Sequence, residues 1–144
     1  MKIIVIDGQG GSLGKAIIEQ IKKQLPQLEP IALGANSIAT AAMIKAGARS
    51  GATGENPVLV NARDADIIMG PIGIIAADSL LGEITPAMAI AIGQSPAIKL
   101  LIPMGKCRVR IVGLPEQAYA EYVRQAVDEL KKLIDQINAG HNVD

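Results

Sequence analysis

The chain has little of what most catalytic and metal sites are built from. Its 144 residues include one cysteine, one histidine, two tyrosines and no phenylalanine or tryptophan. A single cysteine cannot form an internal disulfide, and one cysteine with one histidine cannot supply the ligands of a structural zinc site. A Ser-His-Asp triad and a histidine-rich metal centre are close to excluded as well. We therefore predict no metal site and leave the catalytic residues, if the protein is an enzyme, open.

The chain also has no excess of positive or negative charge. Lysine and arginine number 14, aspartate and glutamate also number 14, and the formal net charge is zero. This balance lacks the basic field with which a protein neutralises the phosphates of a duplex. Two tyrosines are too few for a platform on which single-stranded bases stack. We expect no nucleic-acid partner.

Long apolar runs are absent. No run approaches the roughly 18 residues of a membrane span. The first apolar run, residues 3–6, ends at Asp7 and is too short for the apolar region of a signal peptide. The expectation is a cytoplasmic protein with no membrane partner.

Apolar patterning predicts strands alternating with helices. The β-branched run at 3–6 is typical of a strand buried on both faces of a parallel sheet, and alternation predicts right-handed crossovers. We predict one Rossmann-like α/β domain over residues 1–139, with a free tail at 140–144. Its sheet is doubly wound, mostly parallel and about six-stranded, in the order 3-2-1-4-5-6, with a long C-terminal helix. The expected strands are 3–6, 31–33, 58–60, 66–69, 98–102 and 109–112, the expected helices 12–24, 38–44, 86–92 and 116–138, and 48–57 is expected to be a loop.

A glycine-rich turn follows the first strand. Gly8 lets the chain leave the strand sharply, and Gly10 and Gly11 let the backbone approach a pyrophosphate because they carry no β-carbon. Gly14 leaves room for the helix to pack on the strand. The N–H groups of the first helical turn are expected to point at the ligand, whose negative charge the helix dipole favours. The predicted cofactor-binding residues here are Asp7, Gly8, Gln9, Gly10, Gly11, Ser12, Leu13, Gly14 and Lys15.

Two well-known phosphate-binding patterns do not fit this turn. The dinucleotide pattern Gly-x-Gly-x-x-Gly fails because Leu13 stands at its third glycine. The Walker A pattern fails because Gln9 replaces its first glycine and Ala16, not serine or threonine, follows Lys15. A tight connection without any ligand remains an alternative.

The spacing Gly8-x-x-Gly11-x-x-Gly14 resembles the cofactor turn of extended and atypical short-chain dehydrogenases, in which a basic residue often follows, as Lys15 does here. That resemblance implies an NAD(P)-like dinucleotide. The catalytic Tyr-x-x-x-Lys of that superfamily is absent, since Val123 and Ala126 stand four residues after Tyr119 and Tyr122. We expect both tyrosines to pack in the core.

Further site residues are expected at the carboxyl ends of the other strands, where the ligand of a doubly wound sheet lies. Gly70 and Pro71 would face the glycine turn if the fourth strand neighbours the first. Asn36 stands where a ribose-binding acid is expected, which favours NADP over NAD, although it also fits a simple turn. Asp78 is the carboxylate expected nearest the crevice, and a solvated position suits it too. Cys107, which has no histidine partner, is not expected to be catalytic.

A second resemblance covers nearly the whole chain. The sequence resembles a small bacterial family, found mostly in anaerobic Firmicutes and catalogued as a domain of unknown function. The resemblance implies no activity. It is carried by the segments Ile6-Asp7-Gly8-Gln9-Gly10-Gly11, Gly51–Asn56, Gly70-Pro71-Ile72-Gly73 and Gly82–Met88.

Three hypotheses of function remain. The first is a nucleotide or dinucleotide binder, with NAD(P) as the expected cofactor. The second is a P-loop-related ATP or GTP binder, since Gly10-Gly11 and Gly14-Lys15 resemble the deviant Walker motif of partition-type ATPases. The third is a structural or regulatory homo-oligomer without nucleotide. Under each hypothesis we predict a homo-oligomer, because the C-terminal helix carries a broad apolar stripe. The 50–56 segment is expected at the amino end of the sheet, and we assign it to a subunit contact.

Overall fold

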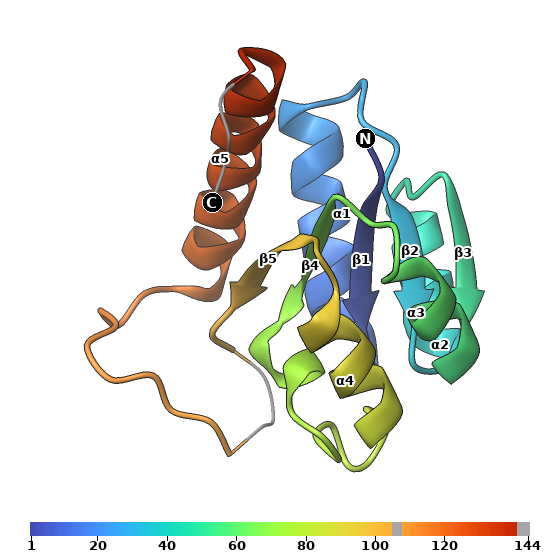
Figure 1. The fold of residues 1–144 in the computed structure, drawn as a ribbon. Helices are drawn as coiled ribbons and strands as arrows, with labels where there is room; N and C mark the ends of the chain where they lie inside the picture. Colours follow the sequence, from blue (N-terminus) through green and yellow to red (C-terminus); the bar gives the residue numbers. More distant parts are fainter. Residues whose placement is uncertain (105–107, 141–144) are drawn as a thin grey trace.

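The structure is a computed structural model that describes residues 1–104 and 108–140. Strands alternate with helices along the chain (Figure 1). The strands are β1 (Ile3–Asp7), β2 (Ile31–Gly34), β3 (Ser50–Thr53), β4 (Ile67–Pro71) and β5 (Ile98–Ile102). The helices are α1 (Ser12–Gln24), α2 (Ser37–Lys45), α3 (Glu55–Asn61), the short 3-10 helix η1 (Ile72–Ile75), α4 (Pro86–Gln94) and α5 (Tyr119–Asn138).

The described strands form one parallel sheet in the order β3-β2-β1-β4-β5. β1 lies at its centre, paired with β2 on one side and β4 on the other, and all five of its residues are buried. The predicted α/β class, parallel sheet and strand order are confirmed for these five strands. The chain steps outward from β1 to β3 and then returns to β4 on the other side, so the strand order reverses between β1 and β4.

Helices cover both faces of the sheet. Successive β1 side chains alternate between the two apolar cores, because side chains of a strand point to opposite faces in turn. Val5 packs in the core with Ile17 of α1 and Val127 of α5, while Ile6 packs in the core with Val58 of α3 and Met88 of α4. In Figure 1 the long α5 lies beside α1. In the described part of the chain, none of the helices is both long enough and apolar enough for a membrane span.

The third strand lies earlier than predicted. β3 is Ser50–Thr53, inside the expected loop, whereas the expected strand at 58–60 belongs to α3. β3 is an edge strand of small, mostly exposed residues, so it has no apolar signature, and its register comes from pairing with β2. α2 packs close to this strand, since a β-carbon on Gly51 would lie 2.8 Å from Cδ1 of Ile44. In α3, Pro57 is tolerated in the first turn, where N–H groups have no helical partner.

The sixth strand does not form. Residues 109–112 leave the sheet and lie in the exposed connection that leads to α5, and Val112 is 97% exposed. Figure 1 shows this connection (orange) projecting away from β5. The β-branched composition of the segment therefore has no partner strand in the described chain, and β5 is the sheet edge.

Side chains cap the starts of two helices. Thr85 caps α4 by accepting a hydrogen bond from the Met88 N–H, with Pro86 at the first helical position. α2 is capped by Asn36 and not by Ser37, because the Asn36 side chain accepts from the Ala39 N–H at 2.9 Å.

Candidate functional site

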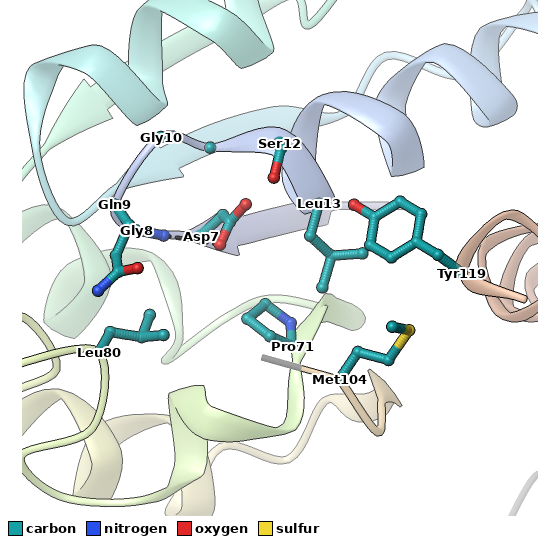
Figure 2. A pocket seen from close by; sticks show the side chains of 11 residues that line it. Asp7, Gly8, Gln9, Gly10, Ser12, Leu13, Pro71, Leu80, Met104 and Tyr119 are labelled. Carbon is teal, nitrogen blue, oxygen red and sulfur yellow. Dashed lines mark hydrogen bonds between the residues drawn. The ribbon is translucent and has the colours of Figure 1, made fainter. Parts of the chain in front are cut away.

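A pocket of about 300 Å³ opens where β1 and β4 end (Figure 2). This is the crevice between the two strands at which the strand order reverses, the usual ligand position in an open α/β sheet. Most of the lining comes from the end of β1, the turn that follows and the start of α1, and the rest from the end of β4, the loop between η1 and α4, the residues after β5 and the start of α5. The lining residues are Asp7, Gly8, Gln9, Gly10, Gly11, Ser12, Leu13, Pro71, Leu80, Met104 and Tyr119.

The turn has two residues in the left-handed region of backbone conformation. Gln9 has a φ of 50° and Gly11, which directly precedes α1, a φ of 71°. The Gly11 N–H donates to the Gly8 carbonyl at 2.9 Å, which closes the turn. A β-carbon on Gly11 would lie 2.6 Å from the Ala39 Cα, so Gly11 is small because α2 packs against it. A β-carbon on Gly10 would meet nothing within 4 Å. No protein atom therefore occupies the space beside Gly10, and a ligand has room there.

Two side chains from distant loops hold Gln9 in its unusual conformation. The Gln9 N–H donates to Oε2 of Glu83 at 2.9 Å, and the Gln9 carbonyl accepts from Nδ2 of Asn36 at 2.8 Å. Nδ2 of Asn36 also donates to Oε2 of Glu83 at 3.0 Å. Both amide hydrogens of Asn36 are thus engaged, and its oxygen caps α2. Asn36, which was predicted to bind ribose, lies behind the turn and does not line the pocket.

Asp7 is the buried last residue of β1, and its carboxylate accepts hydrogen bonds from the turn and from the first turn of α1. Its carboxylate accepts from the Gly8 N–H at 2.8 Å and from the Gly14 N–H at 2.7 Å. Burial raises the pKa of Asp7 above its ordinary value, the N–H groups of Gly14, Gly8 and Leu13 oppose this rise, and the charge of Glu83 adds to it. The expectation that all first-turn N–H groups point at a ligand is wrong for Gly14, because Asp7 takes its hydrogen bond.

The raised pKa of Asp7 predicts a pH dependence of stability. Between 3.8 and the higher folded-state pKa, the folded protein holds a proton on Asp7 that the unfolded chain has lost. Stability from this proton is fully present below pH 3.8 and is lost as pH rises through the folded pKa. Asp7→Asn removes the titration, so the parent should lose stability relative to this variant as pH rises through that window. Urea unfolding of both proteins across a pH series measures this, and a difference constant with pH would contradict the assignment.

Two N–H groups of the turn remain free for a ligand. Within the described residues, the N–H groups of Gly10 and Ser12 have no hydrogen-bond acceptor, whereas those of Gly8, Gln9, Gly11 and Gly14 are bonded. Ser12 also exposes its hydroxyl at the start of α1. The described lining contains no lysine, arginine or histidine. The free donors of the pocket are therefore neutral, and they lie beside the carboxylate of Asp7.

The structure brings together most of the predicted site but not all of it. The lining includes the predicted residues Asp7–Leu13 and Pro71. Gly70 is not a lining residue: it packs against β1, and a β-carbon on it would lie 2.3 Å from the Ile6 carbonyl oxygen. Gly14 packs against Met43 of α2. Lys15 is exposed and pairs with Glu19 at 3.7 Å, outside the lining.

Three residues of the candidate site were not predicted: Leu80 and Tyr119 line the pocket, and Glu83 accepts a hydrogen bond from the turn. Met104, which also lines the pocket, lies in the segment after the fifth strand, residues 103–107, that the sequence places at the crevice. Asp78, the carboxylate expected nearest the crevice, is exposed and does not line it. Nothing in the local sequence distinguishes Tyr119 from a core residue of α5. Glu83 could have been considered from the sequence, since it lies in the segment 82–88 that supports the family resemblance.

The 50–56 segment does not lie where the sequence predicts it. Because residues 50–53 form β3, Gly54 and Glu55 lie at the carboxyl edge of the sheet, not at its amino edge, and the Glu55 carboxylate accepts from the Thr85 hydroxyl. Cys107 lies outside the described residues. Among the residues described, no three side chains of the metal-ligating types gather into a site.

A family model described as "Domain of unknown function (DUF3842)" matches residues 2–135. The chain belongs to this family. DUF3842 thus covers β1 through most of α5, including every described lining residue of the pocket. No curated protein shows significant sequence similarity to the chain.

One solved structure is similar to this DUF3842 chain. It is a dodecameric FMN-dependent UbiX-like decarboxylase from Escherichia coli O157:H7, 16% identical, with a TM-score of 0.44, and the match covers 91% of this chain and 95% of that one. At this identity and TM-score, the likeness says nothing of what the DUF3842 chain binds.

Proposed function

We propose that the protein binds a nucleotide or dinucleotide in the pocket between the ends of β1 and β4. The observation that carries the proposal is the position of the glycine turn: it lines a cavity at the crevice where the strand order reverses, and its Gly10 and Ser12 N–H groups are unpaired. A volume of about 300 Å³ lies at the lower end of small-molecule sites. It suits the ribose-phosphate part of such a ligand, with the remainder extending outward.

The donors and acceptors of the pocket match the two polar ends of a nucleotide. The unpaired N–H groups of Gly10 and Ser12 suit phosphate oxygens, which only accept hydrogen bonds. The carboxylate of Asp7 has lone pairs beyond the two hydrogen bonds that it accepts from backbone, and these suit the hydroxyl donors of a ribose. NAD(P) is one member of this class. The choice between NAD and NADP no longer follows from Asn36, whose amide hydrogens are engaged.

The P-loop alternative depends on Lys15. A P-loop lysine must reach the β- and γ-phosphates, whereas Lys15 is exposed, paired with Glu19 and outside the lining. The first turn of α1 also offers fewer free donors than a P-loop, because Asp7 binds the Gly14 N–H. These contacts favour the first hypothesis over the second.

A matched pair of variants tests the proposal. We expect the parent to bind at least one of AMP, NAD, NADP, FMN and ATP in calorimetry, and ligand at a hundredfold its dissociation constant to stabilise the protein by about 2.7 kcal/mol in thermal unfolding. Gly10→Ala places a methyl group in open space on the pocket lining, so it should weaken binding about tenfold or more while leaving stability unchanged. Lys15→Ala should change affinity less than about threefold.

Two outcomes would reject this reading. If the parent binds none of the five compounds, or if Gly10→Ala binds as tightly as the parent, the glycine turn is only structural. If Lys15→Ala removes ATP binding and leaves the other ligands unaffected, the P-loop alternative replaces the proposal.

The predicted homo-oligomer and the single domain over 1–139 stay predictions. Apolar side chains of the connection before α5 are exposed, among them Val109, Ile111 and Val112. Leu114 of the same connection lines a groove with Leu100 of the edge strand β5. This is the surface on which a second copy is expected.

A further inference from the structure

Tyr119 places a phenol over the glycine turn, although its helix begins more than a hundred residues later in the chain. It is the first residue of α5 and lines the pocket together with Ser12 and Leu13. Figure 2 shows its hydroxyl directed from α5 toward the start of α1. The ring packs at the margin of the core that α1 and α5 share, which fixes the direction of the hydroxyl.

The Tyr119 hydroxyl is buried without a hydrogen-bond partner among the described residues. A buried polar group without a partner is uncommon in native proteins, since leaving it unpaired costs free energy. Tyr122, one turn further along α5, shows the ordinary arrangement: its hydroxyl donates to the Pro115 carbonyl at 2.6 Å. Because Tyr119 lines the cavity, a ligand bound there is a candidate for the missing partner of its hydroxyl.

The hydroxyl is a donor at neutral pH. Burial raises the pKa of Tyr119, the charge of Asp7 raises it further, and the Ser12 hydroxyl, which faces it without completing a hydrogen bond, opposes the rise. The protonated phenol and the unpaired N–H groups of Gly10 and Ser12 give the described lining three neutral donors.

We infer that Tyr119 binds the anionic group of the ligand, and that this group is the phosphate of a sugar or nucleoside phosphate ester. In this arrangement the phosphate accepts hydrogen bonds from the three neutral donors, and the carboxylate of Asp7 accepts from the hydroxyl groups of the same molecule. The inference rests on the proposed function and adds to it the residue and the ligand group that the site recognises.

Ribose 5-phosphate is the probe of choice, because it carries the phosphate and hydroxyls of a nucleotide but no base that absorbs with tyrosine. The chain has two tyrosines and no tryptophan, so in Tyr122→Phe all tyrosine fluorescence comes from Tyr119. We expect ribose 5-phosphate to change the tyrosine fluorescence of Tyr122→Phe. In calorimetry, Tyr119→Phe should bind the probe about tenfold more weakly than the parent, whereas Tyr122→Phe should bind it as the parent does.

Stability separates this role from a merely structural one. Tyr119→Phe removes an unpaired hydroxyl, so its thermal midpoint should equal or exceed that of the parent, whereas Tyr122→Phe loses the hydrogen bond to Pro115 and should melt at a lower temperature. If the parent binds the probe and Tyr119→Phe binds it equally well, the inference fails and the proposed function stands. If the parent binds neither ribose 5-phosphate nor any of the five nucleotides, both fail.

Discussion

Gly11→Ala should lower the free energy of unfolding by about 2–4 kcal/mol, the largest loss expected from a single methyl group in the turn. Gly11 has a φ of 71°, a conformation that a residue with a β-carbon adopts at a cost. The added β-carbon would also lie 2.6 Å from the Ala39 Cα and 3.0 Å from the Ala39 carbonyl oxygen. These atoms are backbone of α2, so the contact can be relieved only by moving one helix against another. Urea unfolding of the variant and the parent measures the loss.

Gly10→Ala is the matched control for this effect. It adds the same methyl group one residue earlier, where nothing lies within 4 Å, and should leave the free energy of unfolding within about 0.5 kcal/mol of the parent. Equal stability of the two variants would contradict the packing of α2 on the turn. The pair also corrects a natural expectation from the sequence, that both glycines are small for the sake of a phosphate. The packing of α2 accounts for Gly11, whereas Gly10→Ala tests the proposed ligand site.

Glu83→Ala should destabilise the protein by about 1–3 kcal/mol, because it leaves two part-buried donors without their acceptor. Oε2 of Glu83 accepts from the Gln9 N–H at 2.9 Å and from Nδ2 of Asn36 at 3.0 Å. Without it, the left-handed conformation of Gln9 is held by the single hydrogen bond from Asn36 to its carbonyl. We therefore expect faster hydrogen exchange at residues 9–11 in addition to the lower unfolding free energy. Both are measured on the free protein.

Glu83→Gln separates the geometry of this contact from its charge. The amide oxygen of glutamine can accept from the same two donors, so the variant should retain most of the stability and the slow exchange of the parent. The loss of charge should bring the pKa of Asp7 closer to its ordinary value, since the charge of Glu83 adds to the rise. If Glu83→Ala is as stable as the parent, Glu83 does not hold the turn.

Several elements of the fold could be predicted because their signals are local. A β-branched run buried on both faces indicates a central parallel strand, and the glycines after it indicate a sharp turn. Apolar residues four apart, Leu13, Ile17 and Ile21, mark the face of α1 that is buried. Thr85 and Pro86 mark the start of α4 in the same way. In each case the residues that determine the conformation are neighbours in the chain, so periodicity and capping chemistry suffice.

The elements that sequence reasoning misplaced depend on partners far along the chain. Residues 50–53 are small and mostly exposed, and they form β3 because β2 offers an open edge beneath α2. Residues 109–112 have the composition of a strand, yet no described edge pairs with them. A strand is stabilised by hydrogen bonds to another strand, so its composition alone decides neither case.

The same division holds within the site. The sequence by itself determined that a glycine turn follows the central strand, and hence which end of the sheet carries the pocket. Only the tertiary structure decided that Glu83 accepts from the Gln9 N–H, 74 residues earlier in the chain, and that Asn36 donates to the Gln9 carbonyl. It also decided that Tyr119 lines the pocket next to the start of α1. It also decided that the Asp7 carboxylate takes the Gly14 N–H. The physical reason is that a local pattern specifies the conformation of its own segment, whereas the partner of a polar group depends on which loops the packed helices bring to the same edge of the sheet.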